Sequence, residues 1–570
     1  MSLVNLKINN KDVSVQEGVS ILQAAKKLDI KIPTLCYLEC QEVKGNCRIC
    51  IVELKNRNKI VASCSTPVYE GMEVLTNTKK VRAIRKTILE LMLANHPKDC
   101  LTCIRNGNCE LQTLAYEYNI RKIPFERTQH SLPIDNTNPA IIRDPNKCIK
   151  CGRCVEVCHK VQNMGIINFA NRSHEYTVTT PFGKTLDQTN CLLCGQCTTV
   201  CPVGAIYEKE DVDRVWNAIY NPELHVVVQT APAVRVSLGE EFGYEPGTIV
   251  TGQLASVLRK LGFNKVFDTN FSADLTIMEE ASELIERIKS KGPLPLMTSC
   301  SPGWINYIEK VEPSLIPHIS SCKSPQQMFG AIAKTYYCKK VNIDPSKVFV
   351  VSVMPCTAKK YECTREEMKS SGFKDVDAVI TTRELARMIK ELGIDLKDVD
   401  CEDFDSPLGE SSGAGAIFGA TGGVMEAALR TAYEVLTETE LKDLDFTEVR
   451  GMDGIKETSV TLNGLELKAA VVNGIKNVQP IIKKIKDGTC DYHFVEVMCC
   501  PGGCIGGGGQ PIGGSEIKQK RLEAIYREDK NKKIRKSHEN PEIQKLYNEF
   551  LIKPLGEKSH KLLHTKYKKI

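Results

Sequence analysis

The sequence predicts a multidomain protein with α/β and α+β parts, and three observations support this prediction. The chain has 570 residues, enough for about three to five domains at ~150 residues each. Groups of closely spaced cysteines recur through the first 210 residues, as in small iron-sulfur domains. From residue 211 to residue 570, strand-like apolar runs alternate with amphipathic helices, a pattern typical of a sheet covered by helices.

Residues 1–80 are predicted to form a small β-rich domain with a β-grasp pattern. Apolar and polar residues alternate over Val4 to Ile8 and over Val13 to Val15, on either side of a turn at residues 9–12, which indicates a hairpin. Residues 20–28 then have helical spacing behind a Ser20 cap.

Four cysteines follow this pattern with the spacing C-x10-C-x2-C-x13-C. They are Cys36, Cys47, Cys50 and Cys64. Plant-type ferredoxins hold a 2Fe-2S cluster around a loop of this kind, although four thiolates also suit zinc. The preceding β-grasp pattern favours one 2Fe-2S cluster and a ferredoxin-like domain. Cys40 fits no ligand spacing and is expected to be a spare loop thiol.

Residues 81–128 are predicted to be a helical His/Cys cluster domain. Apolar residues recur at helical intervals over residues 81–94, and Pro97 marks the end of the helix. A set with the spacing H-x3-C-x2-C-x5-C follows: His96, Cys100, Cys103 and Cys109. Such a set binds zinc or a 4Fe-4S cluster. Its position between two cluster domains favours 4Fe-4S.

Residues 129–210 contain one four-cysteine run twice. Each run reads C-x2-C-x2-C-x3-C: first Cys148, Cys151, Cys154 and Cys158, then Cys191, Cys194, Cys197 and Cys201. This is the run of bacterial two-cluster ferredoxins, in which the fourth cysteine of each run ligates the other cluster. We therefore expect a 2x4Fe-4S ferredoxin-like domain, with its clusters close enough for electron transfer.

The 26 cysteines and the net charge of +6 limit the class of protein. Disulfide scaffolds are small and secreted, whereas this chain is long and repeats C-x2-C pairs. The chain starts without a signal pattern and has no run of ~18 apolar residues, so we expect a reduced, cytoplasmic protein with no membrane span. The charge is too mild and dispersed for nucleic acid, but a weakly basic surface suits an acidic carrier.

Three loops in residues 211–570 carry cysteines where strands are expected to end. They are Thr-Ser-Cys-Ser-Pro-Gly-Trp at 298–304, Met-Pro-Cys-Thr at 354–357, and Met-Cys-Cys-Pro-Gly-Gly-Cys at 498–504. Glycine permits the backbone to approach a bulky inorganic group closely. These cysteines could also be ordinary buried core residues, but that interpretation does not explain three such loops. The polar, basic tail at 537–570 is expected to be a solvated terminal helix that wraps the domain.

These loops resemble the three signatures of the iron-only (FeFe) hydrogenases, specifically the large monomeric clostridial type. The resemblance covers essentially the whole chain and includes the glycine-rich stretch at 411–428. It implies a C-terminal α/β H-cluster domain, a monomer, and reversible reduction of protons to H2 linked to ferredoxin or flavodoxin. The family's H-cluster is a 4Fe-4S cubane joined to a two-iron subsite with CO, cyanide and azadithiolate, which maturation proteins insert.

The resemblance also implies which residues would surround this cofactor. Cys356, Cys500 and Cys504 match three ligands of the cubane, and Cys504 matches the position that bridges to the two-iron subsite. Lys359 matches the residue that hydrogen-bonds a cyanide. Matching pocket positions are Pro232, Gln326, Met354, Phe418 and Met498. The residue after Pro232 is often Ser in the family, and here it is Ala233, so one cyanide contact is expected to be lost.

A proton route also follows from the resemblance. The matching positions are Cys300, Glu280, Ser320, Glu283 and Arg287, in order from the cofactor to the surface. Glu280, Glu283 and Arg287 recur at helical intervals within residues 275–288, so one helix face can present all three. Without the resemblance, these charges would be interpreted as a solvated helix face.

The chain departs from the family at one ligand position. The family motif is Thr-Ser-Cys-Cys-Pro-x-Trp, and Ser301 stands where the second Cys, the fourth cubane ligand, is expected. An alkoxide is a harder ligand than the thiolate that iron-sulfur clusters prefer. Three outcomes stay open: Ser301 ligates, Cys300 turns in to ligate, or the additional thiol of Cys499 takes part.

Three other functions stay open beside a ferredoxin-linked hydrogenase. A sensory, low-activity hydrogenase is disfavoured because Cys300 is present and no further module follows the tail. A subunit of a larger redox complex, such as an electron-bifurcating hydrogenase, is compatible with the first 210 residues, which also look like the iron-sulfur arm of an NADH dehydrogenase subunit. A non-enzymatic iron-sulfur assembly protein would lack the N-terminal relay and the proton route.

Overall fold

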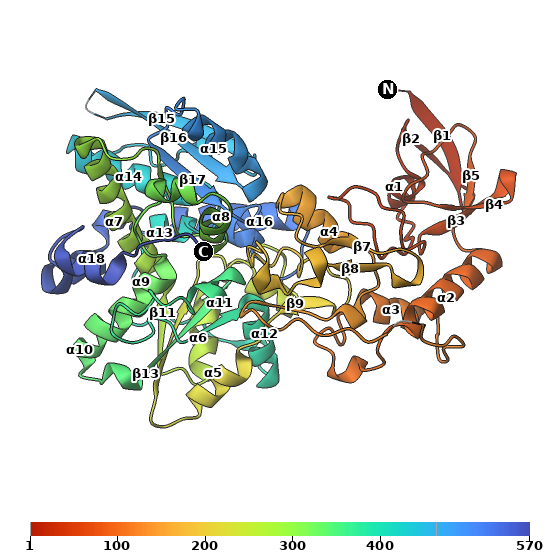
Figure 1. The fold of residues 1–570 in the computed structure, drawn as a ribbon, viewed down its shortest axis with the longest axis horizontal. Coiled ribbons are helices and arrows are strands. Elements are labelled where there is room, and N and C mark those ends of the chain that lie inside the picture. Colours follow the sequence, from red (N-terminus) through yellow and green to blue (C-terminus); the bar gives the residue numbers. More distant parts are fainter. Residues whose placement is uncertain (1, 129, 463) are drawn as a thin grey trace.

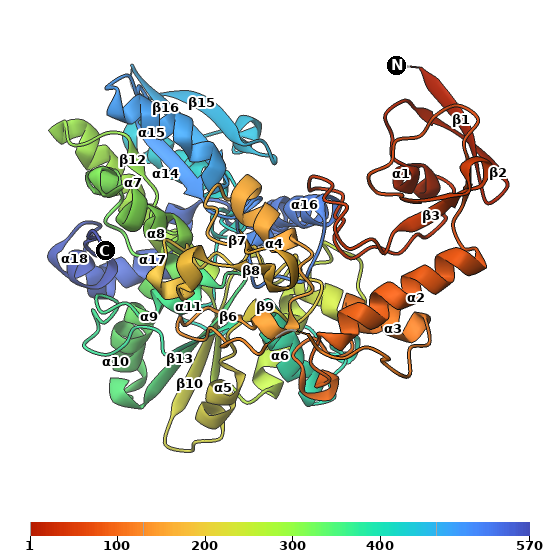
Figure 2. The same ribbon diagram turned by 45° about the vertical axis from the view of Figure 1, so that its right-hand side comes forward.

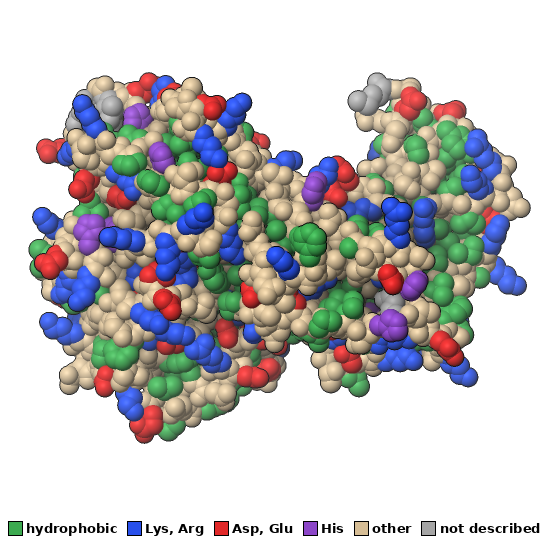
Figure 3. Space-filling model, in the orientation of Figure 1, with side chains coloured by type: hydrophobic (Ala, Val, Ile, Leu, Met, Phe, Trp, Pro, Cys, Tyr) green, Lys and Arg blue, Asp and Glu red, His purple; other side chains and the backbone are tan. Residues whose placement is uncertain are grey.

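The computed structural model describes residues 2–128, 130–462 and 464–570. A small N-terminal sheet domain stands apart from a large α/β domain, and the ferredoxin-like segment lies between them (Figure 1 and Figure 2). Charged side chains of both signs are interspersed over the visible face, in keeping with the small net charge (Figure 3). No helix in the described ranges is long and apolar enough to cross a membrane.

The N-terminal domain is a five-stranded sheet in the order β2-β1-β5-β3-β4. Its strands are β1 Leu3–Ile8, β2 Lys11–Gln16, β3 Ile51–Leu54, β4 Lys59–Ala62 and β5 Glu73–Leu75. The predicted hairpin is formed by β1 and β2, and its turn is shorter than expected, because Asn9 and Asn10 both adopt positive φ and close it in two residues. Helix α1 (Ile21–Lys26) begins at Ser20, which forms a capping box with Gln23.

Two helices and two short hairpin-like pairs connect this domain to the rest. Helix α2 (Lys79–Ala94) is capped by Thr78 and contacts β3, and α3 (Glu110–Glu117) follows the His/Cys segment. The ferredoxin-like segment contains α4 (Arg153–Glu156) and two antiparallel pairs. These are β6 Ile141–Arg143 with β9 Ile206–Glu208, and β7 Asn168–Ala170 with β8 Thr177–Thr179.

The C-terminal domain contains two sheets. One is parallel, in the order β11-β10-β13-β14: β10 His225–Thr230, β11 Lys265–Asp268, β13 Val348–Met354 and β14 Ala378–Thr381. The other has the order β12-β17-β16-β15: β12 Leu296–Met297, β15 Ile455–Leu462, β16 Leu465–Asn473 and β17 Phe494–Met498. In this second sheet only β15 and β16 are antiparallel. The strand-like apolar runs of the sequence, at 226–229, 348–353, 378–380 and 469–472, form strands β10, β13, β14 and β16.

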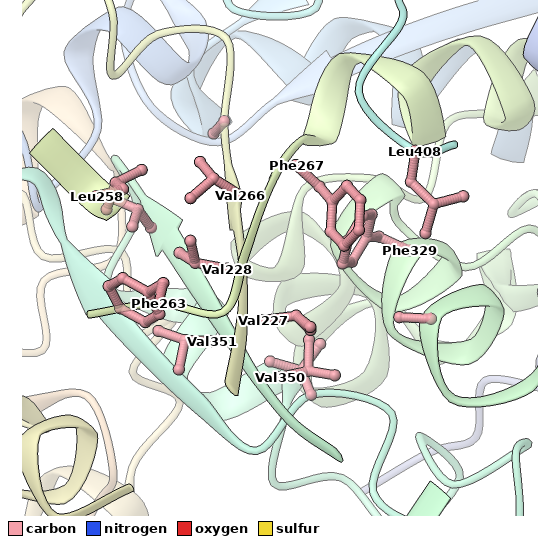
Figure 4. Close-up of a cluster of buried hydrophobic side chains, with 14 of the residues drawn as sticks. Val227, Val228, Leu258, Phe263, Val266, Phe267, Phe329, Val350, Val351 and Leu408 are labelled. Carbon is pink, nitrogen blue, oxygen red and sulfur yellow. The ribbon is translucent and has the colours of Figure 1, made fainter. Parts of the chain in front are cut away.

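Helices cover these sheets on both faces. In the first sheet, Val227 and Val228 point to opposite faces, and Phe329 and Phe263 lie on those two sides (Figure 4). Burial on both faces explains why the strands are continuous apolar runs. The helices are α5 Val212–Ile219, α6 Thr251–Lys260, α7 Thr269–Ser290, α8 Pro302–Val311, α9 Pro325–Ile332, α10 Cys338–Val341, α11 Ala358–Glu362, α12 Thr382–Glu391, α13 Gly413–Ile417, α14 Gly423–Thr437, α15 Gln479–Lys486, α16 Ser515–Asn531, α17 Pro541–Leu546 and α18 Glu557–Leu563.

The tail differs from the expected single solvated helix. It forms two short α-helices, α17 and α18, and Leu562 and Leu563 are buried. After α18 the chain pairs with the segment around Cys322 through a bridge at His564. The tail is bound because its leucines supply apolar surface to the main core, which a count of polar and basic residues does not reveal.

A buried ion pair joins the ferredoxin-like segment to the C-terminal domain. Arg383 in α12 donates from Nη2 to Glu208 Oε2 at 2.7 Å and to the Gly508 carbonyl at 2.9 Å. Burial raises the pKa of Glu208, but Arg383 and Arg387 outweigh that effect and hold it below its ordinary value. This contact fixes the segment against the loop that carries the third cysteine signature.

We expect Arg383→Leu to lower the free energy of unfolding by about 3 kcal/mol, because it leaves the buried Glu208 carboxylate with only its longer contact to Arg387, at 3.4 Å. Lys390→Leu on the same helix is the control, since Lys390 pairs with Glu241 at the surface, where a pair contributes about 0–1 kcal/mol. Urea unfolding followed by circular dichroism measures both. Equal losses in the two variants would contradict a structural role for the Arg383 pair.

Candidate active site

The three cysteine loops meet where parallel strands of both sheets end. Strand β12 is followed by residues 298–301, β13 by Cys356, and β17 by residues 499–504. Strand β10 contributes Pro232 from the neighbouring position in its sheet. Ligands in α/β sheets bind at the carboxyl ends of the strands, and here two such edges enclose one cavity.

The cavity is lined by thiols and by apolar side chains. All the pocket and cubane positions named from the sequence line it: Pro232, Cys300, Ser301, Gln326, Met354, Cys356, Lys359, Phe418, Met498, Cys500 and Cys504. Burial raises the pKa of Cys356, and the nearby Cys500 and Cys504 raise it further, so the three sulfurs lie close together. Soft sulfur donors in an apolar cavity fit a 4Fe-4S cubane better than a hard cation.

Ser301 and Cys499 lie side by side at the edge of this cavity. The backbone N–H of Cys499 donates to Ser301 Oγ at 3.3 Å, and both residues line the cavity. Cys499 is buried, and its Sγ lies 2.6 Å from the position that a Cβ on residue 303 would take. Gly303 is therefore required by this thiol. Cys499 and Ser301 are thus neighbours through this backbone contact, which sequence spacing did not show.

Lys359 is held by a carboxylate that the sequence analysis missed. Its Nζ donates to the Cys300 carbonyl at 3.1 Å and to Glu362 Oε2 at 3.0 Å. Glu362 also accepts from Ser324 Oγ at 2.8 Å and from Gln326 Nε2 at 3.1 Å. The spacing of Lys359 and Glu362 by three residues in α11 was a usable signal. The pair orients the ammonium toward the loop of the first signature.

Part of the expected proton route is a continuous hydrogen-bond chain. Ser320 Oγ donates to Glu283 Oε2 at 3.0 Å, and Arg287 Nη2 donates to Glu283 Oε1 at 2.6 Å. Ser320 is fully buried, whereas 15% of the Arg287 side chain is exposed. Helix α7 presents Glu280, Glu283 and Arg287, and the predicted helix is confirmed. The chain therefore runs from the interior to the surface.

Glu280 lies between this chain and Cys300. It is 1% exposed, and neither carboxylate oxygen has a hydrogen-bond partner among the described residues. Burial raises its pKa to about 8, and the nearby Ser320 hydroxyl only partly offsets this. Glu280 also raises the pKa of Cys300, after the larger effect of burial, so the two groups are close. A buried carboxyl with this pKa holds a proton at neutral pH.

The comparisons with known proteins agree with this geometry. Residues 224–508 match the iron-only hydrogenase large subunit, C-terminal domain, and residues 515–570 match the iron hydrogenase small subunit. Iron hydrogenase 1 of Clostridium pasteurianum is 43% identical over 99% of this chain and 99% of its own length. The chain belongs to the iron-only hydrogenase family. The predicted family and fold class are confirmed.

Further similarities concern the rest of this hydrogenase. Subunit HndD of the NADP-reducing hydrogenase of Solidesulfovibrio fructosivorans is 50% identical over 100% of the chain and 99% of that protein. A solved structure of an apo variant of the FeFe-hydrogenase from Chlamydomonas reinhardtii is also similar, with 45% sequence identity and a TM-score of 0.57. The match covers 63% of this chain and 99% of the Chlamydomonas chain. Residues 2–79 match a 2Fe-2S binding domain, 85–124 the NADH-ubiquinone oxidoreductase-G iron-sulfur binding region, and 147–205 a 4Fe-4S dicluster domain.

The first two cysteine sets of the hydrogenase lie in its N-terminal part. The four thiols expected at the 2Fe-2S site are buried and form two pairs: Cys50 Sγ with Cys64 Sγ at 3.3 Å, and the Cys47 N–H with Cys36 Sγ at 3.5 Å. Cys40 is exposed, unlike these four buried cysteines. In the second set, burial lowers the pKa of His96, which keeps its imidazole neutral, the form that binds metal.

The two repeated runs form two mixed cavities in the hydrogenase. One is lined by Cys148, Cys151, Cys154 and Cys201, and the other by Cys158, Cys191, Cys194 and Cys197. Each cavity thus contains three cysteines of one run and the fourth of the other. Bacterial two-cluster ferredoxins share cysteines between their two runs in this way.

Contacts join these cavities to their neighbours at both ends. Arg153 donates to Glu110 Oε2 at 2.8 Å and to the Tyr37 carbonyl at 3.2 Å, so both N-terminal sites adjoin the first cavity. Thr357 Oγ1 donates to the Leu193 carbonyl at 2.7 Å, and Cys500 Sγ lies 3.9 Å from the Cys194 carbonyl. The second cavity therefore adjoins the active site.

Proposed function

We propose that this hydrogenase interconverts H2 with two protons and two electrons, using ferredoxin or flavodoxin as its electron carrier. The observation that carries the proposal is the thiol-lined cavity from which Cys300 and Glu280 lead toward the Ser320–Glu283–Arg287 chain. When bound, the H-cluster supplies the metal chemistry of this interconversion. Its protein ligands would be Cys356, Cys500, Cys504 and Ser301. The enzyme would act as a monomer, and maturation proteins would insert the two-iron subsite.

The protein's own residues would supply proton access and orientation. Cys300 gives or takes a proton at Sγ inside the cavity, and Glu280 exchanges it with Ser320. A bridging water explains the unpaired oxygens of Glu280, since buried polar groups are normally satisfied. Lys359 directs its positive charge into the cavity, where it would bind a cyanide. Met354, Met498 and Phe418 exclude bulk water.

Electrons would enter through the N-terminal part. We propose a 2Fe-2S cluster on Cys36, Cys47, Cys50 and Cys64, and three 4Fe-4S clusters, one on His96, Cys100, Cys103 and Cys109 and two in the mixed cavities. Because both N-terminal sites adjoin the first mixed cavity, two entrances converge there. The second mixed cavity then delivers electrons to the active site.

H2 evolution from reduced ferredoxin by the fully matured protein tests this function. We expect turnover with reduced ferredoxin and with reduced methyl viologen. No H2 from either donor, in protein whose infrared spectrum shows bound CO and cyanide, would contradict the proposal.

A second function is favoured by one comparison, the 50% identity with a subunit of an NADP-reducing hydrogenase. Here the chain would be the hydrogen-forming subunit of a larger complex. Tagged protein purified from its native cells would then carry flavin- and NADP-binding partners and form H2 from NADPH. Purification as a single chain that accepts electrons from ferredoxin alone would favour the first function.

The pKa of Glu280 sets an expected pH dependence. Because the pKa in the folded protein is raised from 4.5 to about 8, Glu280 is protonated at neutral pH and loses its proton as the pH rises through that value. We expect H2 evolution to decline there, and Glu280→Gln to be at least ~100-fold slower at every pH. Glu286→Gln, exposed on the same helix, is the control. A profile with the same decline in Glu280→Gln would contradict this assignment.

A further inference from the structure

A second hydrogen-bond chain leaves Glu283 in a direction away from Arg287. Ser321 Oγ donates to Glu283 Oε2 at 3.1 Å, and His564 Nδ1 lies 2.8 Å from Ser321 Oγ. The second ring nitrogen, Nε2, lies 3.1 Å from Glu279 Oε2. Glu283 is therefore a junction of two chains, one through an arginine and one through a histidine.

This histidine chain is buried and firmly held. His564 is 8% exposed and Glu279 is 0% exposed. Tyr547 donates to Glu279 Oε1 at 2.5 Å, and the Leu555 N–H donates to Glu279 Oε2 at 2.8 Å. These two donors fix the Glu279 carboxylate beside the imidazole ring. The tyrosine and the histidine both come from the C-terminal tail.

Backbone pairing fixes the histidine at the proton route. The Thr565 N–H donates to the Ser321 carbonyl and the Lys323 N–H to the Leu563 carbonyl, both at 2.8 Å. One helical turn earlier, His560 is exposed, and its ring lies 4.5 Å from that of His564, centroid to centroid. Solvent is thus one imidazole ring away from the buried one.

We propose that Ser321, His564 and Glu279 form a second proton entrance that joins the route at Glu283. The inference rests on the proposed hydrogenase function. In the inward step, the imidazolium Nδ1–H bond breaks and its proton goes to Ser321 Oγ, while the Ser321 O–H proton goes to Glu283 Oε2. The imidazole that remains keeps its Nε2–H bond toward Glu279, and its vacant Nδ1 takes up the next proton from solvent that reaches the 8% exposed ring beside His560. Histidine suits this role because its ordinary pKa lies near neutrality.

The groups that face His564 agree with this direction of transfer. They are Glu279 and Glu283 from α7, Cys322 from the paired segment and His560 from α18, and Tyr547 from the tail contacts Glu279. Cys322 Sγ lies 3.9 Å from Glu283 Oε2, and burial raises the pKa of this thiol, so it stays protonated. The two carboxylates are the anionic members of this set.

Blocking each entrance separately and then together tests the proposal. We expect Arg287→Leu and His564→Ala each to keep about a tenth or more of the native rate of H2 evolution, since the other entrance still operates. In the double variant, the fold-decrease in the rate of H2 evolution should be at least ~10 times the product of the fold-decreases in the two single variants. Imidazole added to the double variant should restore part of the rate, in proportion to its protonated fraction as pH changes.

Controls separate this role from a structural one and from the function itself. His538→Ala removes a histidine that pairs with Glu434 at 2.8 Å, and should show no such coupling or rescue. Ser321→Ala interrupts the chain without altering His564, and should couple to Arg287→Leu in the same way. Multiplicative losses in both double variants, or no imidazole effect, would overturn the proposal. An inactive native enzyme would instead overturn the hydrogenase function.

Discussion

Cys300→Ala is expected to lower the rate of H2 evolution at least ~100-fold and to leave the clusters in place. The thiol lines the cavity, and its closeness to Glu280 makes it the proposed first proton carrier. Loss of a positioned proton carrier typically costs about 10²–10⁴ in rate. We expect electron entry to be unaffected, because Cys300 lines neither of the mixed cavities.

Three measurements are needed on Cys300→Ala: the rate of H2 evolution, the iron content, and the infrared bands of CO and cyanide. Cys338→Ala is the matched control, since this buried thiol donates to the Ala333 carbonyl in the core, outside the cavity. A near-native rate would contradict the relay role of Cys300. Loss of cubane iron would instead show that Cys300 had turned in to act as a ligand.

Ser301→Ala is expected to abolish H2 evolution completely, because we propose that the Ser301 hydroxyl is the fourth cubane ligand. Ser301→Cys should retain the cubane and raise its reduction potential. An alkoxide is harder than a thiolate and stabilises ferric iron, so the native potential is the lower one. A rise of about 60 mV in this potential would correspond to a tenfold change in the equilibrium constant for one-electron reduction of the cubane.

The neighbouring thiol provides the decisive comparison. Cys499→Ala should keep the cubane if Ser301 ligates, and lose it if Cys499 ligates. Protein produced without maturation proteins isolates this question, since only the iron-sulfur clusters are then loaded. Mössbauer spectra and electron paramagnetic resonance titrations measure cubane occupancy and potential. Loss of the cubane in Cys499→Ala and its retention in Ser301→Ala would reverse our assignment.

The iron-sulfur domains could be predicted because their characteristic cysteines are close in sequence. His96, Cys100, Cys103 and Cys109 fall within one short segment, so their spacing alone restricts the metal groups they can hold. The same holds for the helix that presents Glu280, Glu283 and Arg287, since its periodicity is local. The tail was predicted wrongly for the converse reason: its polar composition says nothing about which surface its few leucines meet.

By itself, the sequence determined which groups are available: the cysteine runs, the helix face, and the serine at a ligand position. The tertiary structure decided which of them meet. Cys499 lies against Ser301 across 198 residues of sequence, and His564 reaches Ser321 across 243. Local spacing is limited by the covalent chain, whereas such distant contacts depend on how two sheets and a tail pack. Only that packing shows Cys499 beside Ser301 and a histidine beside the proton route.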